Sequence, residues 1–282
     1  MLEFIVSGVG FYYFFAHSFT TDRPFIQFAI FKDKNFAAGC GFMVVIGVVL
    51  FSTMALASPL FQNAFGYPIL TAGLLLATRG SGTFVAMMLV SRLMKYFEAK
   101  YLIATGLSLI AITLFDMTGW TADTQVKTIV INSVIQGFGL GLVFVPLTTA
   151  AFLTLPNHLR TDGTSMLTLI RNVASSIGIS IVIAQLTSGT IRTHAVLAEH
   201  ITPFNHALQM PNVTSIINLQ TDAGRAMMDA ILYAQAQIIS FSQDFELVTL
   251  VTLCAIPLAF IMGSTKASMR NPGASDHAAV ME

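Results

Sequence analysis

Three polar side chains lie inside long apolar runs of this 282-residue sequence, and their types limit the chemistry they can do. Arg79 and Arg171 carry permanently charged donors, whereas Gln136 can both donate and accept hydrogen bonds. None of the three is a nucleophile or a general base. The sequence also contains no HExxH, no GxSxG and no pair of aspartates within one apolar run. These residues can bind a polar group or one another, so the sequence predicts a protein that is not an enzyme.

The elements that must hold these side chains are apolar helices. Hydrophobic residues make up 55% of the chain and charged residues only 10%, against about 25% charged in a soluble domain. The net charge is zero, which gives no basic surface for nucleic acid. The composition predicts an all-α, polytopic helical membrane protein. Its apolar runs are drawn at 2–16, 39–59, 70–91, 101–118, 127–152, 166–187 and 246–264.

Depth in the membrane indicates which of the three polar side chains is most costly to bury. Arg79 lies about 13 Å from residue 70 along a helix, near the bilayer midplane. An arginine there costs at least ~2.5 kcal/mol, so it should face the bundle interior or a wet cavity. We assign Arg79 and Gln136 to a substrate pathway or coupling site; the alternative is that Arg79 binds backbone carbonyls and fixes packing. Arg171 lies nearer a helix end, where it either reaches the interface or closes a gate.

Glycines and one proline interrupt the same runs. Gly137 and Gly141 are four residues apart and share a helix face, which predicts close helix packing, and we give Gly178 the same role. Pro146 removes one backbone hydrogen bond, so we expect a hinge there, with the threonines at 148–149 satisfying the freed carbonyls. The GxGxG string at 137–141 follows no strand, which excludes a phosphate-binding loop.

Lysine and arginine alternate between the loops on the two sides of the predicted bundle. One side holds nine of them and the other holds three, which are Lys127, Arg192 and Arg225. Positive loops stay in the cytoplasm, so the C-terminus is predicted to be cytoplasmic. Arg92, Lys95, Arg160 and Arg171 are assigned to a cytoplasmic gate. The nine lie in 17–38, 92–100, 153–165 and 265–282.

The spans and loops define four predicted regions. Residues 1–16 are a span whose first part is missing, since about 15 apolar residues are short of the roughly 20 that cross a bilayer. Residues 17–38 form a cytoplasmic interfacial segment or a loop packed beneath the bundle. The bundle, 39–264, includes an outer helical extension at 188–245 with a helix from Thr221 to about Ser242. Residues 265–282 are a cytoplasmic tail.

Several strings of residues together resemble one transporter family. They are PFIQFAIFKDKNF at 24–36, YPILTAGLLLATRGSGTFVAMMLVSRLM at 67–94, QGFGLGLVFVPLTTAAFLTLP at 136–156 and SMLTLIRNVASSIGISI at 165–181. In this order and spacing they resemble the EmrB/QacA-type drug:proton antiporters of the major facilitator superfamily. The string SRLMKYFEAKYL at 91–102, which holds Arg92 and Lys95, is similar to the superfamily's charged gating loop.

The resemblance implies how the chain is organised and what it does. Family members have fourteen spans, of which this chain would supply the last linker span and the C-terminal six-helix half. That half would consist of two inverted three-helix repeats, 39–118 and 127–264. The implied activity is export of hydrophobic drug-like compounds across the bacterial inner membrane, driven by the proton gradient without a cofactor. The implied partners are membrane lipid, the missing N-terminal half and, through 188–245, a periplasmic adaptor protein and an outer-membrane channel.

Two other functions stay open on the sequence alone. An uptake symporter of the same superfamily would share the fold, although the outer extension argues against it. A membrane scaffold or sensor that transports nothing would use 188–245 to bind a partner. Both alternatives predict the same helical bundle, so only transport measurements separate them from an exporter.

Overall fold

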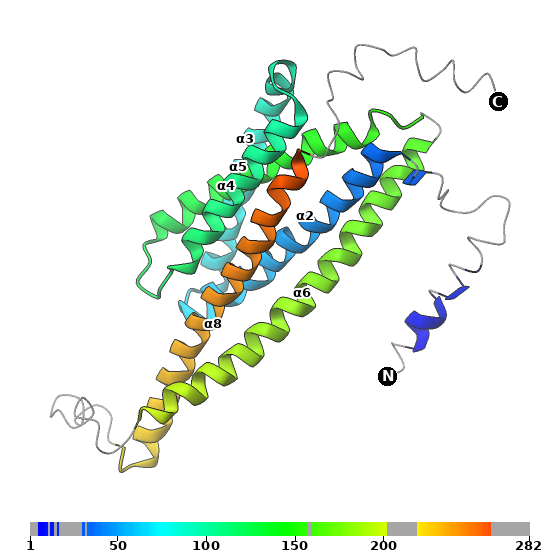
Figure 1. Cartoon of the computed structure of the whole chain (residues 1–282). Coiled ribbons are helices and arrows are strands. Elements are labelled where there is room, and N and C mark those ends of the chain that lie inside the picture. The colour runs from blue at the N-terminus through cyan, green and yellow to red at the C-terminus, as the bar shows by residue number, and fades with distance from the viewer. Residues whose placement is uncertain are drawn as a thin grey trace, which may run out of the picture.

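The computed structural model describes residues 5–10, 12–13, 16, 30–31, 33–156, 159–201 and 219–260. It confirms the all-α class: six helices in this part of the chain are long and apolar enough to cross a membrane, and it contains no strand (Figure 1). The elements are α2 (Lys34–Pro59), a short π-helix η2 (Leu60–Ala64), α3 (Ile69–Tyr96), α4 (Ala99–Thr118), α5 (Val126–Phe152), α6 (Arg160–Glu199) and α8 (Asp222–Ala259).

Side chains cap the first and last of these helices. Asp33 accepts hydrogen bonds from the backbone N–H groups of Asn35 (2.8 Å) and Phe36 (3.3 Å) at the start of α2. Thr221 accepts one from Gly224 N–H (3.1 Å), which confirms the predicted start of the outer helix. These bonds satisfy donors that a helix N-terminus otherwise leaves unpaired.

Two helices are much longer than a bilayer requires. α6 has 40 residues and α8 has 38, which correspond to about 60 Å and about 57 Å against a hydrocarbon core of ~30 Å. Figure 1 shows the end of α6 and the start of α8 projecting together beyond the other helices. The predicted break between the outer helix and the last span, after Ser242, is wrong. α8 runs through it because no glycine or proline lies between Gly224 and Pro257.

The helices pair in a pattern that relates the first three to the last three. α3 packs most extensively on α5, and α2 packs most extensively on α6. α4 lies against both α5 and α8, and α6 also contacts α8. The second helix of each group therefore packs on the first helix of the other group, an arrangement that an inverted three-helix repeat produces.

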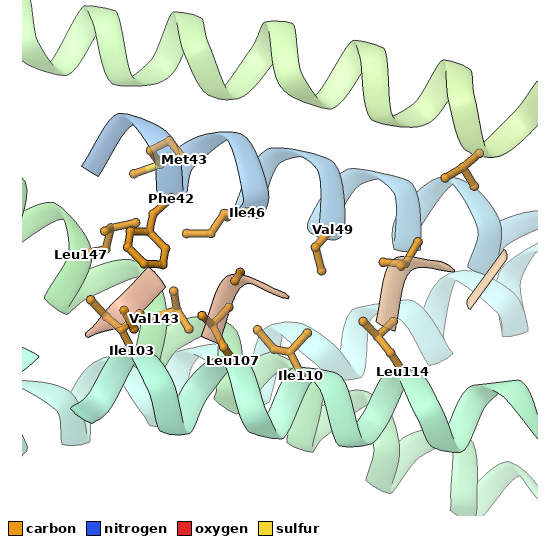
Figure 2. Close-up of a cluster of buried hydrophobic side chains, with 14 of the residues drawn as sticks. Phe42, Met43, Ile46, Val49, Ile103, Leu107, Ile110, Leu114, Val143 and Leu147 are labelled. Carbon is orange, nitrogen blue, oxygen red and sulfur yellow. The ribbon is translucent and has the colours of Figure 1, made fainter. Parts of the chain in front are cut away.

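The core lies where α2, α4 and α5 meet. Figure 2 shows ten labelled apolar side chains pointing toward one another from these three helices. All ten are buried, and Leu107 and Leu114 are 2% and 0% exposed. Because lipid is as apolar as these side chains, their packing stabilises the bundle chiefly through van der Waals contact. They are Phe42, Met43, Ile46, Val49, Ile103, Leu107, Ile110, Leu114, Val143 and Leu147.

Several predicted regions fall partly or wholly outside the described residues. This applies to much of 1–16 and 17–38, to 202–218 in the outer extension, and to the tail at 265–282. Residues 34–38, predicted as part of an interfacial segment, are instead the first turn of α2, because Asp33 caps the helix there. Ile30 is 1% exposed, so this end of the segment is packed against the bundle.

Truncation of the core should destabilise the bundle far more than truncation of its surface. Leu107→Ala leaves a cavity between α2, α4 and α5 and is expected to lower the free energy of unfolding by about 2–5 kcal/mol. Ile112→Ala, on the same helix but 63% exposed, should change it by less than about 0.5 kcal/mol. Denaturation of the purified variants in detergent measures both. Equal losses would contradict the described core.

Candidate functional site

Arg79 of α3 and Gln136 of α5, singled out in the sequence, are in direct contact. The guanidinium Nη2 of Arg79 donates a hydrogen bond to Oε1 of Gln136. Gln136 is 3% exposed, and Arg79 is half-buried. A charged donor strengthens this bond but the amide does not neutralise the charge. Within the described part of the chain no carboxylate forms an ion pair with Arg79, so its charge stays available for an anionic or polar group.

Close approach of α3 and α5 makes this contact possible. A Cβ added at Gly137 would overlap the backbone carbonyl oxygen of Arg79, and one at Gly82 would overlap that of Val134. The Thr83 hydroxyl crosses the interface and bonds to the Gly137 carbonyl at 3.0 Å. The two backbones are therefore held nearer than any larger residue allows. The side chains of Arg79 and Gln136 meet because their backbones already touch.

Gly141 and Pro146 lie further along α5. A Cβ at Gly141 would come within 2.5 Å of the Ala86 Cβ of α3, so the tight contact continues for another turn. α5 continues as a helix through Pro146, and the hinge there stays a prediction. The two threonines after it donate to the carbonyls of Phe144 and Val145, at 2.9–3.0 Å. Because Pro146 has no N–H, it is the Leu142 carbonyl that loses its helical hydrogen bond. The threonines bond to other carbonyls, so the expectation that they satisfy the freed carbonyl is wrong.

A second close contact joins α2 and α6. A Cβ at Gly178 would lie 3.0 Å from Val48 Cα and 3.1 Å from Ser52 Oγ, and one at Gly47 would lie 2.6 Å from the Arg171 carbonyl oxygen. The Arg171 side chain is half-buried, and its Nε atom is buried without a hydrogen-bond partner among the described residues. Arg171 thus lies beside the α2–α6 contact rather than free in water.

The other residues assigned to a cytoplasmic gate are not joined to one another by a described hydrogen bond. Arg92 and Lys95 are exposed in the last turns of α3. Arg160 donates from Nε to the Leu155 carbonyl at 3.4 Å, which ties the start of α6 to the preceding loop. Their joint role as a gate stays a prediction.

The structure shows an exposed polar stripe on α6 that the sequence analysis did not single out. The stripe consists of Asn172, Ser176, Ser180 and Thr187, which recur at helical spacing and are exposed. The three hydroxyls donate to their own helix backbone at 2.9–3.0 Å. The spacings of four, four and seven residues can be read from the sequence, but only the packing of α6 on α2 and α8 shows which face stays uncovered.

Two shallow grooves border the stripe. One, of about 300 Å³, lies between α2 and α6 and is wholly apolar, with Val44, Val48, Val173 and Ile177 in its wall. The other, of about 640 Å³, follows α6 and has Ser180, Thr187 and Ser188 among its isoleucines. A surface with much apolar area and a few hydroxyls suits hydrophobic molecules that carry occasional polar groups.

Sequence reasoning also missed a polar cluster at one end of α4. Asp116 is exposed, and its Oδ2 accepts hydrogen bonds from Asn132 Nδ2 (2.8 Å) and Trp120 Nε1 (3.1 Å). Asn132 is 5% exposed and also donates to the Thr113 carbonyl at 3.0 Å. The signal was the asparagine itself, an amide in an apolar run, which requires partners when buried.

The fold and these helix contacts define a polytopic helical membrane protein, and comparison with known proteins gives its family. The Major Facilitator Superfamily model matches residues 5–179, and the chain belongs to that family. The chain is 26% identical to the uncharacterized MFS-type transporter YhcA of Bacillus subtilis, over 83% of this chain and 45% of that protein. It is 27% identical to the multidrug export protein EmrB of Escherichia coli K12, over 71% of this chain and 40% of that protein.

Two further proteins, one compared by sequence and one by structure, are also similar to this chain. The lincomycin resistance protein LmrB of Listeria innocua is 25% identical over 67% of this chain and 40% of its own length. A crystal structure of a bacterial homologue of the human lysosomal transporter Spinster, inward-facing and unoccupied, has the same fold. Its TM-score is 0.60 at 15% identity, and the match covers 86% of this chain and 52% of that one. The chain therefore spans about half or less of the length of the proteins it resembles.

The contact between α3 and α5 should be sensitive to a single methyl group. Gly137→Ala forces the helices apart at the Arg79 carbonyl, so we expect the free energy of unfolding to fall by about 1–3 kcal/mol. Gly80→Ala is the matched control, because a Cβ there meets nothing within 4 Å and alanine favours helix by up to about 1 kcal/mol. Thermal unfolding in detergent compares the two. A Gly137→Ala protein as stable as Gly80→Ala would refute the close contact.

Proposed function

We propose that the chain is the C-terminal half of a proton-driven multidrug exporter that moves hydrophobic compounds by alternating access. The names of its relatives EmrB and LmrB, a multidrug export protein and a lincomycin resistance protein, support export rather than uptake. Substrate would bind between this half and an N-terminal half, with the proton gradient as the energy source and no cofactor. Such an N-terminal half would account for the additional length of the relatives, of which this chain covers 45% and 40%.

The uncovered polar stripe of α6 is the observation that carries this proposal. An exposed amide such as Asn172 is costly against lipid, so this face needs water, substrate or protein beside it. It adjoins the apolar α2–α6 groove, which offers area to hydrophobic molecules. A second half packed across this face would enclose a cavity with both kinds of surface.

Arg79 and Gln136 add a polar site within the same half. Because the arginine has a neutral partner, a substrate or a carboxylate of the other half can compete for it at little cost. We assign this pair to the substrate pathway or to coupling. Arg92, Lys95, Arg160 and Arg171 would then act at the cytoplasmic end.

The proposed setting is the bacterial inner membrane with the C-terminus in the cytoplasm, as the distribution of lysine and arginine favours. The projecting parts of α6 and α8 then lie on the outer side. They carry exposed apolar side chains, among them Ile191 (65%), Val196 (50%) and Met227 (46%). Apolar side chains beyond the membrane favour a protein partner there, and a periplasmic adaptor leading to an outer-membrane channel is the partner we assign.

The test of the proposed function is transport from the native gene. The chain is expressed from its own locus, so that any sequence encoded upstream is translated with it, in a host that lacks its own exporters. Cells should accumulate less fluorescent drug, and a protonophore should abolish the difference. Unchanged accumulation, together with a partner captured by the outer helices, would favour a scaffold or sensor. Protonophore-sensitive uptake would favour a symporter.

The 282-residue chain alone should not export. One half lacks the opposite wall of the cavity, so proteoliposomes containing only this chain are expected to show no drug movement when a proton gradient is applied. The control is the product of the native locus, reconstituted at the same density. Gradient-driven drug movement by the chain alone would refute the assignment of a half-transporter.

Loss of the Arg79 charge should impair transport without loss of protein. In the transporting system Arg79→Ala is expected to reduce export at least about tenfold, a cost of ~1.4 kcal/mol or more, with normal abundance in the membrane. Lys127→Ala, which removes an exposed charge at the start of α5, is the matched control and should export normally. Parallel loss of abundance and export in Arg79→Ala would instead support a packing role.

A further inference from the structure

One buried acidic side chain plays no part in the site described above. Asp244 lies in α8 and is 1% exposed, although the sequence analysis placed it outside the last span. Its neighbours along the helix, Phe241 and Phe245, are 1% and 0% exposed. α8 contacts α2, α4, α6 and η2, so the residue is enclosed by the bundle on several sides.

Among the described residues, no donor stabilises a negative charge on one oxygen of the Asp244 carboxyl group. Its Oδ2 atom is buried without a hydrogen-bond partner in the described part of the chain. The other aspartates of α8 differ: Asp222 pairs with Arg225 at 2.5 Å and Asp229 with His194 at 3.0 Å. An ionised carboxylate that is buried and unpaired costs several kcal/mol, whereas a protonated one is only a modest polar group.

The contact of α8 with α6 shows what faces Asp244. A Cβ at Gly189 of α6 would lie 3.2 Å from Ser240 Oγ, so Ser240 faces α6. Asp244 is one helical turn further on and shares that face. By helix rise from the position of α6 opposite Asp244, Arg192 lies about 10 Å away and is exposed, and His194 lies about 13 Å away in the same direction and pairs with Asp229. Arg171 lies about 21 Å away in the other direction.

Charged groups on the remaining elements do not reach the Asp244 carboxyl either. Asp116, at the end of α4, is bonded to Asn132 and Trp120. Glu246, two residues along α8, is exposed on another face, and η2 contains no charged residue. On α2 the charged residue is Lys34, at the opposite end of that helix.

We propose that Asp244 is a proton-binding site of the C-terminal half: it holds a proton in the packing described here and gives it up to water when α8 and α6 part. The contact of α6 with α8 is less extensive than that of α6 with α2 or of α8 with α4, so it offers less resistance to such parting. The π-helical turn η2, a geometry frequent at functional sites, packs against the same helix. That this proton is coupled to export rests on the proposed function. That Asp244 binds a proton does not rest on it.

Infrared spectroscopy of the purified chain in lipid nanodiscs tests the binding directly. At neutral pH the wild type should show the C=O stretching band of a protonated carboxylic acid, and Asp244→Asn should lack it. Glu246→Gln, the matched control on the same helix, should keep the band. Asp244→Glu should shift it, which keeps the test valid if the asparagine variant does not fold. A wild type without the band, or a band that survives in folded Asp244→Asn, would overturn the proposal.

Proton movement in the transporting system tests the coupling. Asp244→Asn should still bind drug, but its gradient-driven export should fall to that of wild type treated with a protonophore. Full export by Asp244→Asn would overturn the coupling. If the wild type itself exports nothing, the proposed function fails while the infrared result still decides whether Asp244 binds a proton. The two failures are therefore distinguishable.

Discussion

Backbone contact between α3 and α5 is the constraint on which the rest of the site depends. At Gly82 and Gly137 the two helices approach so closely that a single methyl group would overlap a carbonyl oxygen of the opposite helix. This proximity brings the Arg79 guanidinium to the Gln136 amide. A separate close approach, at Gly106 and Gly139, holds α5 against α4 in the same way. In a lipid solvent, where apolar surface gains little by burial, small residues that allow such approach are what hold helices together.

The fold was predictable from the sequence because its main signals are long and repetitive. Runs of some twenty apolar residues and an alternation of positive loops need no tertiary information. The pairing of Arg79 with Gln136 was less accessible, because both were recognised as costly in lipid without any indication that they share one interface. Their spacing along the chain says nothing of the α3–α5 crossing, which the glycines bring about.

Other features escaped the sequence for identifiable physical reasons. Asp244 fell in the predicted outer extension at 188–245, just before the predicted span at 246–264, yet α8 continues unbroken past it. The polar stripe of α6 was visible as serines and threonines, but such residues also pack at helix contacts, and only the arrangement of neighbouring helices shows that this face is uncovered. Which side chains are buried depends on how the helices pack together, whereas periodicity can be read from the sequence of each helix alone.

The unbroken length of α6 has a mechanical consequence. One continuous helix of 40 residues joins the loop after α5, through the α2 contact at Gly178, to the tip that projects beyond the bundle. Because no break interrupts it, α6 links the projecting tip mechanically to the end beside Arg160 and Arg171, and its glycine contacts with α2 lie between the two. A displacement of the projecting tip is therefore transmitted along α6 to the end beside Arg160 and Arg171.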